Sequence, residues 1–159
     1  YIVSFDFMVL FGAPNSYSGG CYIFLGNPVL PSEGDTNGYF IRFICSHNYL
    51  DTSLEIVRLD NSVESVIGEY NSEFGNIIGS EYHIKLGRID SEMVAKLWLA
   101  GEPEPDWQVS VTDDSYHSGF WMPNFVHSGG WIDNFQVEGH GVVSTDQKTW
   151  GDVKAQYRW

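Results

Sequence analysis

Apolar and polar residues alternate with a period of two along most of this chain, and the 3.6-residue period of an amphipathic helix is nearly absent. The alternating runs are separated by clusters of the turn-forming residues Gly, Pro, Asn, Asp and Ser. We predict strands at about residues 1–11, 20–25, 38–46, 53–59, 63–69, 81–88, 92–99, 107–112, 118–125 and 130–138. Many short, regularly spaced strands predict an all-β fold, namely a two-sheet antiparallel jelly-roll sandwich.

The hairpin formed by residues 81–88 and 92–99 has a register that the pattern assigns residue by residue. One face is apolar throughout and is predicted to be core, with these pairs: Tyr82 with Leu99, Ile84 with Leu97, Leu86 with Ala95. The other face places Lys85 opposite Lys96 and His83 opposite Trp98. Two opposed like charges are unfavourable unless an anion lies beside them. That anion is either a carboxylate on a neighbouring strand or part of a bound ligand.

The next predicted strand, residues 107–112, extends this arrangement. We expect its polar residues to continue the lysine face: Gln108, Ser110 and Thr112. Its apolar residues alternate with them and are expected to face the core: Trp107, Val109 and Val111.

Composition narrows the class of protein. The 159 residues are 43% hydrophobic and 16% aromatic, which excludes a disordered chain and is enough for the core of one domain. No apolar run approaches the ~20 residues of a membrane-spanning helix. The formal net charge of −13 argues against nucleic acid as a partner, because binding its backbone requires clustered Lys and Arg. An acidic excess instead suits divalent cations and solubility outside the cell.

The two cysteines, Cys21 and Cys45, lie in separate predicted strands. They form a disulfide if their Cα atoms lie within about 7 Å of each other. The alternative is two buried thiols that never meet. The sequence leaves both alternatives open.

Five short motifs in the second half of the chain carry a family resemblance. They are Tyr-x-Ile-Lys at residues 82–85, Ala-Lys-x-Trp at 95–98, Glu-Pro-x-Trp at 104–107, Ser-Gly at 118–119 and Asp-Asn-Phe-x-Val at 133–137. In this order they resemble the laminin-G-like or concanavalin A-like lectin sandwiches of bacterial secreted proteins. The resemblance implies a jelly roll outside the cell or at its surface. Such domains serve as carbohydrate-binding modules, adhesion domains or spacers.

The same resemblance implies a structural calcium ion (Ca2+) near the first and last strands. Each of these strands carries one aspartate flanked by large apolar residues, Asp6 and Asp133. If the two strands pair, the carboxylates meet, and a calcium ion removes their repulsion while accepting oxygen ligands. The alternative is that both carboxylates point outward into solvent.

No catalytic motif is visible, so we expect that the protein is not an enzyme. The Glu-x-Asp-x-x-Glu strand of lectin-like glucanases is absent, and the acidic residues at 102, 104 and 106 lie in a corner interrupted by prolines. The prediction is instead carbohydrate binding, with exposed aromatic side chains stacking on sugars while polar neighbours hold hydroxyl groups. The candidate residues are Trp98, His83, Lys85, Lys96, Tyr116, His117 and Trp121. For Trp121 the alternative is packing in the core.

Residues 1–142 are predicted to form the lectin-like sandwich, and residues 143–159 an amphipathic tail. Alternation in residues 152–159 puts three assembly candidates on one side: Val153, Tyr157 and Trp159. As an extra strand, the tail folds back on its own sheet edge or adds to the sheet edge of another copy. The second case predicts a self-assembling subunit of a filament, tube or surface layer. A helical alternative exists, because residues 150, 153 and 157 fall at i, i+3 and i+7.

Overall fold

The computed structural model describes residues 2–12, 20–26, 37–45, 52–72, 79–116, 124–126 and 128–139. These residues form β-strands, turns and loops, and none of them lies in a helix. The strands are β1 (Ile2–Gly12), β2 (Gly20–Gly26), β3 (Gly38–Cys45), β4 (Thr52–Asp60), β5 (Val63–Ser72), β6 (Glu81–Ile89), β7 (Glu92–Leu99), β8 (Val109–Thr112), β9 (Asn124–Val126) and β10 (Ser128–Glu138). They match the predicted strands, except that β8 is shorter and most of the predicted strand at 118–125 lies outside the described residues.

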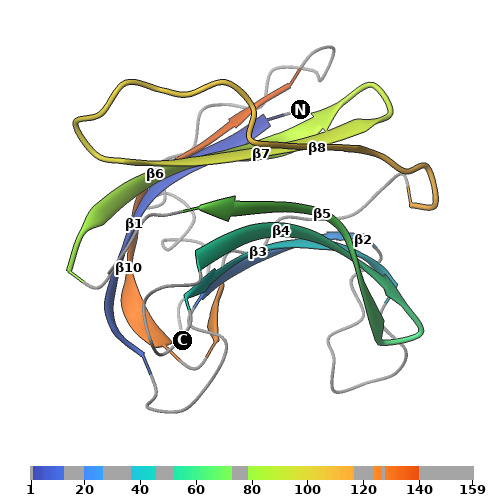
Figure 1. Cartoon of the computed structure of the whole chain (residues 1–159), viewed down its shortest axis with the longest axis horizontal. Helices are drawn as coiled ribbons and strands as arrows, with labels where there is room; N and C mark the ends of the chain where they lie inside the picture. The colour runs from blue at the N-terminus through green and yellow to red at the C-terminus, as the bar shows by residue number, and fades with distance from the viewer. Residues whose placement is uncertain are drawn as a thin grey trace, which may run out of the picture.

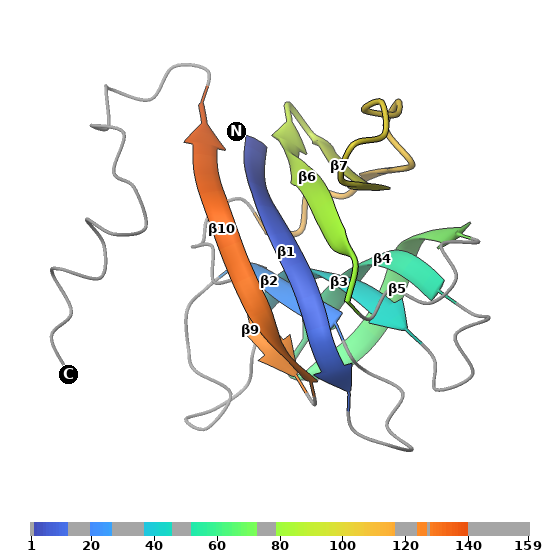
Figure 2. The same cartoon turned by 90° about the vertical axis from the view of Figure 1, so that its left-hand side faces the viewer.

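The strands form two five-stranded antiparallel sheets that pack face to face (Figure 1). Sheet A has the order β10-β1-β6-β7-β8, and sheet B has the order β5-β4-β3-β2-β9. Figure 2 shows β10, β1 and β6 side by side, so the first strand pairs with the last one, which is the condition for Asp6 and Asp133 to meet. This arrangement confirms the predicted all-β jelly-roll sandwich.

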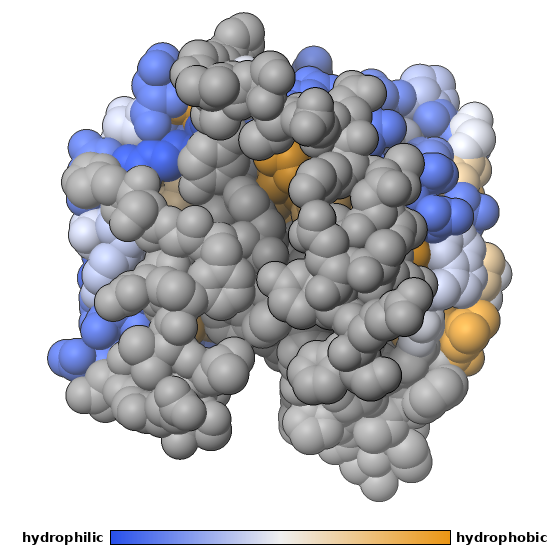
Figure 3. All heavy atoms as spheres, turned by 180° about the vertical axis from the view of Figure 1, so that it is seen from behind, coloured by the Kyte–Doolittle hydropathy of each residue, from blue (hydrophilic) through white to orange (hydrophobic). Residues whose placement is uncertain are grey.

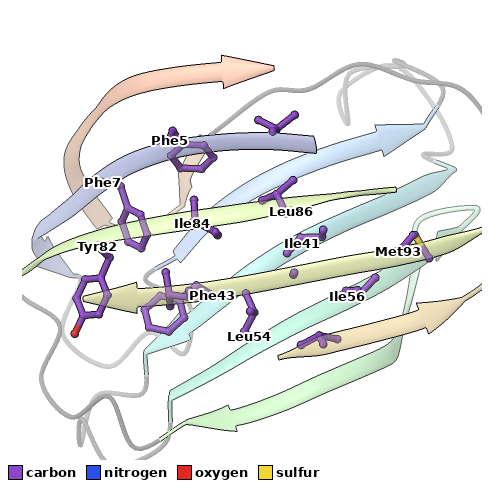
Figure 4. Close-up of a cluster of buried hydrophobic side chains, with 14 of the residues drawn as sticks. Phe5, Phe7, Ile41, Phe43, Leu54, Ile56, Tyr82, Ile84, Leu86 and Met93 are labelled. Carbon is purple, nitrogen blue, oxygen red and sulfur yellow. The ribbon is translucent and has the colours of Figure 1, made fainter. Parts of the chain in front are cut away.

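The core lies between the sheets and is built from alternate residues of the strands (Figure 4). Phe7 of β1 is fully buried in it, with its ring centroid 5.9 Å from that of Tyr82 and 6.2 Å from that of Phe43 in the opposite sheet. Burying a side chain of this size stabilises the fold by about 1.5–3 kcal/mol. Among the described residues, five aromatic side chains are buried in this core: Phe5, Phe7, Tyr39, Phe43 and Tyr82.

Strands β6 and β7 pair in the predicted register, with Ile84 opposite Leu97 and Lys85 opposite Lys96. Their inward residues are buried, except that Leu99 at the end of β7 is 39% exposed, so the prediction was wrong at this position. The connecting turn contains Asp90 with a φ of 56°, a left-handed conformation that aspartate adopts more readily than most residues. A short turn and a buried face together determine the register.

Residues 100–108, which we call the corner, connect β7 to β8. Both ends of the corner are anchored: the Ala100 amide donates to the Glu81 carbonyl at 2.9 Å, and the Gln108 side chain bonds the backbone N–H and C=O of Leu97 at 2.9 and 3.0 Å. Gly101 has a φ of 91°, which favours glycine. Trp107 does not face the core as expected: the Lys96 ammonium lies 4.4 Å from its ring centroid.

The two sheets approach each other closely where β5 passes β8. A Cβ atom on Gly68 of β5 would lie only 2.9 Å from Cγ1 of Val109. A larger residue at this position would push the sheets apart, because real Cβ contacts are longer than this distance. Glycine therefore allows the close approach of the two strands.

A group of polar side chains, which we call the inter-sheet network, joins the sheets at one end. Asp113, which follows β8 of sheet A, accepts hydrogen bonds from the Tyr39 hydroxyl and from Nη1 of Arg58, the latter at 2.8 Å. Tyr39 and Arg58 both belong to sheet B. Nε of Arg58 also donates to Asp60 at 2.8 Å. The network therefore adds polar contacts to the apolar packing between the two sheets.

On the face seen from behind, described hydrophilic residues lie along the margins and described hydrophobic ones form small patches (Figure 3). Large exposed apolar residues come from several different strands, such as Leu10 of β1, Tyr70 of β5 and Val137 of β10. Single exposed apolar residues are normal on protein surfaces.

Candidate functional site

The outer face of sheet A brings together four of the predicted binding residues. Strands β6 and β7 place His83 beside Trp98 and Lys85 beside Lys96. Strand β1 adds Asp6 opposite His83. We call this group, together with Glu104 of the corner, the Trp98 face. Backbone pairing determines the positions of the residues on β1, β6 and β7, whereas the path of the corner determines that of Glu104.

Two aromatic rings lie side by side on the Trp98 face. The centroids of the His83 and Trp98 rings are 5.3 Å apart, and their planes are inclined by 42°. Nδ1 of His83 contacts Oδ1 of Asp6, whose other oxygen accepts a hydrogen bond from the Asn134 side chain at 2.5 Å. Asp6 therefore orients the imidazole through Nδ1, and Nε2 is the ring nitrogen that Asp6 does not contact. The His83 side chain is one-third exposed.

The two opposed lysines share one carboxylate, that of Glu104. Nζ of Lys85 lies 2.9 Å from both carboxylate oxygens, and Nζ of Lys96 lies 2.7 Å from Oε1. These hydrogen bonds, first from Lys96 and then from Lys85, lower the pKa of Glu104 below its ordinary value. An anion beside the lysines was predicted, but it belongs to the corner and not to a neighbouring strand. Each ammonium group also lies 5.9 Å from the Trp98 ring centroid.

The groups of the Trp98 face differ in their exposure to solvent. The side chain of Lys96 is only 10% exposed, and its ammonium also donates to the Pro105 carbonyl at 2.9 Å. Lys85 and Glu104 are 32% and 42% exposed, and Trp98 is half-buried. A ligand therefore meets part of an indole ring surrounded by hydrogen-bonding groups that the protein already holds in place.

Tyr116 lies elsewhere, at the end of the sandwich that holds the inter-sheet network. Its hydroxyl donates to Asp60 at 2.6 Å, and its ring packs edge-on against Tyr39 with centroids 5.5 Å apart. The hydrogen bond to Asp60, with a contribution from burial, raises the pKa of Tyr116. The structure does not bring Tyr116 to the Trp98 face, and its contacts connect the two sheets.

The predicted pairing of Asp6 with Asp133 is observed, because the two residues face each other across β1 and β10. The oxygen atoms of the two aspartates are not arranged as calcium ligands in this structure. Both oxygens of Asp6 face nitrogen atoms, and Oδ1 of Asp133 accepts the Asn134 amide at 2.8 Å. Among the described residues, no three His, Cys, Asp or Glu side chains are grouped so that they could hold a metal ion. Calcium at this pair stays a prediction.

A second charged cluster, which was not predicted, lies on the outer face of sheet B. Arg42 donates to Glu55 at 2.6 Å and to Glu64 at 2.8 Å, and Ser53 donates to Glu55 at 2.9 Å. Glu55 and Ser53 are each only 7% exposed. The opposite charges of Arg42 and Glu55 on adjacent alternating strands were the sequence signal for this pair.

Several predicted residues lie outside the described part of the chain. These are His117, Trp121, Val153, Tyr157 and Trp159. Self-assembly through the tail and the domain boundary at residue 142 therefore stay predictions. Cys21 and Cys45 lie on the neighbouring strands β2 and β3, but their side chains are not described. Within the described residues, no helix has the length and apolarity needed to cross a membrane.

The fold is a two-sheet antiparallel jelly-roll sandwich. No protein-family model matches the sequence, and no curated protein matches it. Among solved structures, the chain is similar to the carbohydrate-binding module CBM66 from Bacillus subtilis, with a TM-score of 0.63 and 15% sequence identity. The match covers 84% of this chain and 71% of that one. At this identity the likeness shows the fold alone, and it does not single out the laminin-G-like family.

Proposed function

We propose that this chain is a non-catalytic carbohydrate-binding domain and that the Trp98 face holds the glycan. The observation that carries the proposal is the pair of rings, Trp98 and His83, among hydrogen-bonding groups that are already fixed. The similarity of the fold to a carbohydrate-binding module supports the same function. In keeping with the acidic composition, we place the domain outside the cell or at its surface.

The chemistry of the face suits a sugar ring. The C–H groups on one side of a pyranose or furanose are apolar and pack against an indole, while its hydroxyl groups both donate and accept hydrogen bonds. The exposed oxygens of Glu104 accept such bonds, and Lys85 and Nε2 of His83 contact the remaining hydroxyls. Because these groups are held by other protein contacts, little conformational entropy is lost on binding.

The test is affinity electrophoresis through gels that contain a glucan, a mannan, a xylan or a fructan. We expect the wild-type protein to be retarded by at least one of them, and Trp98→Ala to lose that retardation. A central aromatic contact contributes about 2 kcal/mol or more, which corresponds to roughly a 30-fold change in Kd. Tyr70→Ala is the matched control, because Tyr70 is an exposed aromatic residue on sheet B. Undiminished retardation of Trp98→Ala would remove the Trp98 face from the proposal.

A further inference from the structure

We infer that Glu104 makes the Trp98 face selective for uncharged glycans by occupying the two lysines that otherwise bind an anionic polysaccharide. The inference rests on the proposed function and names the chemical class of its ligand. It starts from the electrostatics of the hairpin. Lys85 and Lys96 are two of only eight basic residues in the chain, and backbone pairing holds them directly opposite each other.

Two ammonium groups brought together in this way form a site for a carboxylate or sulfate group. The chain supplies that carboxylate itself, since Nζ of each lysine lies within 2.9 Å of the Glu104 carboxylate. Glutamate is ionised at neutral pH, and the hydrogen bonds from Lys96 and Lys85 lower the pKa of Glu104 further. A polyuronate that approaches the Trp98 face therefore finds its cationic partners already neutralised.

Glu104 lies in a segment of fixed position, because the hydrogen bonds of Ala100 and Gln108 anchor the corner at both ends. This anchoring gives the Glu104 carboxylate a high effective concentration at the lysines, so a ligand carboxylate competes poorly with it. Lys96 is also held by the Pro105 carbonyl and by the rings of Trp98 and Trp107. Its ammonium therefore stays in place when Glu104 is neutralised.

The surrounding charges act in the same direction. Asp6 lies on the same face, and Glu102 and Asp106 are exposed on the corner. Each of them repels an incoming anion, as does the overall charge of −13. An uncharged sugar experiences no such repulsion, and its hydroxyl groups form strong hydrogen bonds with the fixed ionic groups. The charges of the face thus favour a neutral glycan over an acidic one.

The test compares wild type, Glu104→Gln and the matched control Glu102→Gln by affinity electrophoresis in polygalacturonate gels. Each variant loses one negative charge, but only Glu104→Gln removes the carboxylate that pairs with Lys85 and Lys96. We expect no retardation of wild type or Glu102→Gln, and a gain of about tenfold in affinity for Glu104→Gln at low salt, which weakens at higher ionic strength. The double variant Lys85→Gln with Glu104→Gln should lose this gain.

Two results would overturn the inference. The first is retardation of the wild type by polygalacturonate that is as strong as its retardation by neutral glycans. The second is a folded Glu104→Gln variant that polygalacturonate retards no more than the wild type. Circular dichroism establishes that each variant is folded. If Glu104→Gln does not fold, Glu104→Asp keeps the charge but withdraws the carboxylate from the lysines, and a smaller gain in retardation is expected. A wild type that binds no neutral glycan overturns the proposed function. The polygalacturonate comparison between wild type and Glu104→Gln tests the inference about Glu104 independently of that result.

Discussion

Replacing Asp113 by Asn is expected to weaken the connection between the two sheets. The Asp113 side chain is only 13% exposed. Its Oδ2 accepts from Arg58 of sheet B at 2.8 Å, while Oδ1 accepts from the Tyr39 hydroxyl and from the Ser115 amide, the latter at 2.9 Å. Asparagine preserves the shape of the side chain but places an NH2 group where one oxygen stood.

The size of the effect follows from these contacts. An asparagine oxygen still accepts from Tyr39 and Ser115, whereas its NH2 group faces the Arg58 donor and that hydrogen bond is lost. A hydrogen bond to a charged group contributes about 1.5–3 kcal/mol, so the free energy of unfolding should fall by about 2 kcal/mol at pH 7. For a domain of this size, 1 kcal/mol corresponds to roughly 2–4 °C, so Tm should fall by about 4–8 °C.

The difference between wild type and Asp113→Asn should also depend on pH. Burial acts to raise the pKa of Asp113, but the hydrogen bonds from Tyr39, Ser115 and Arg58 outweigh it and hold the pKa well below its ordinary range. A carboxyl group whose pKa is lowered by folding stabilises the native state fully above its unfolded pKa of about 3.9, and this contribution is lost as the pH falls toward the folded pKa. The stability difference should be constant from pH 7 to 5 and shrink below about pH 4.

Urea denaturation at pH 7, 5 and 3 measures this difference. Asp114→Asn is the matched control, because the adjacent carboxylate is 62% exposed and pairs with Arg88 at the surface. An exposed ion pair contributes about 0–1 kcal/mol, so this control should stay close to wild type. Equal stability of Asp113→Asn and Asp114→Asn, or a difference that does not narrow at pH 3, would refute the reasoning.

Three further predictions concern the core, the sheet contact and the metal. Gly68→Ala should lower the free energy of unfolding by about 1–3 kcal/mol, because its Cβ meets Val109 at 2.9 Å; a thermal melt identical to wild type would contradict this contact. Phe43→Ala should cost about 3–5 kcal/mol in urea denaturation, because the side chain is fully buried; a smaller loss than that of an exposed aromatic variant would contradict its place in the core. If Asp6 and Asp133 share calcium, Tm in calcium chloride should exceed Tm in EGTA, and Asp133→Asn should remove the difference; equal melting temperatures would remove the metal prediction.

The fold was predictable because alternation and turn chemistry act over short distances. In the β6–β7 hairpin, the turn and the apolar face leave only one register that buries Ile84 and Leu86, and this register is observed. The pairing of β1 with β10 was considered only as a condition for the Asp6–Asp133 contact, because nothing local in the sequence encodes it. It came from the expected topology of a jelly roll, which joins its first and last strands.

The candidate site was predictable only where backbone pairing determines it. His83, Lys85, Lys96 and Trp98 share one face because their strands are neighbours. The position of Tyr116 depends on the path of the segment after β8 and on contacts with β4, which leave no periodic signal in the sequence.

The corner was the least predictable part of this surface. Its path depends on Gly101, on two prolines and on the Gln108 side chain. This side chain forms the hydrogen bonds to the Leu97 backbone that a neighbouring strand would otherwise form. The alternation rule therefore failed at Trp107, which lies over Lys96 and outside the core. For the same reason, Glu104 was not identified in advance as the partner of the lysines.

An NMR titration of 15N-labelled protein with a glycan that retards the wild type tests the Trp98 face most directly. The indole N–H of Trp98 and the backbone amides of His83 and Lys85 are expected to shift in a saturable manner. The amides of Arg42 and Glu55 on the outer face of sheet B serve as the internal comparison. Saturable shifts confined to sheet B, with the Trp98 indole unchanged, would contradict glycan binding at the Trp98 face.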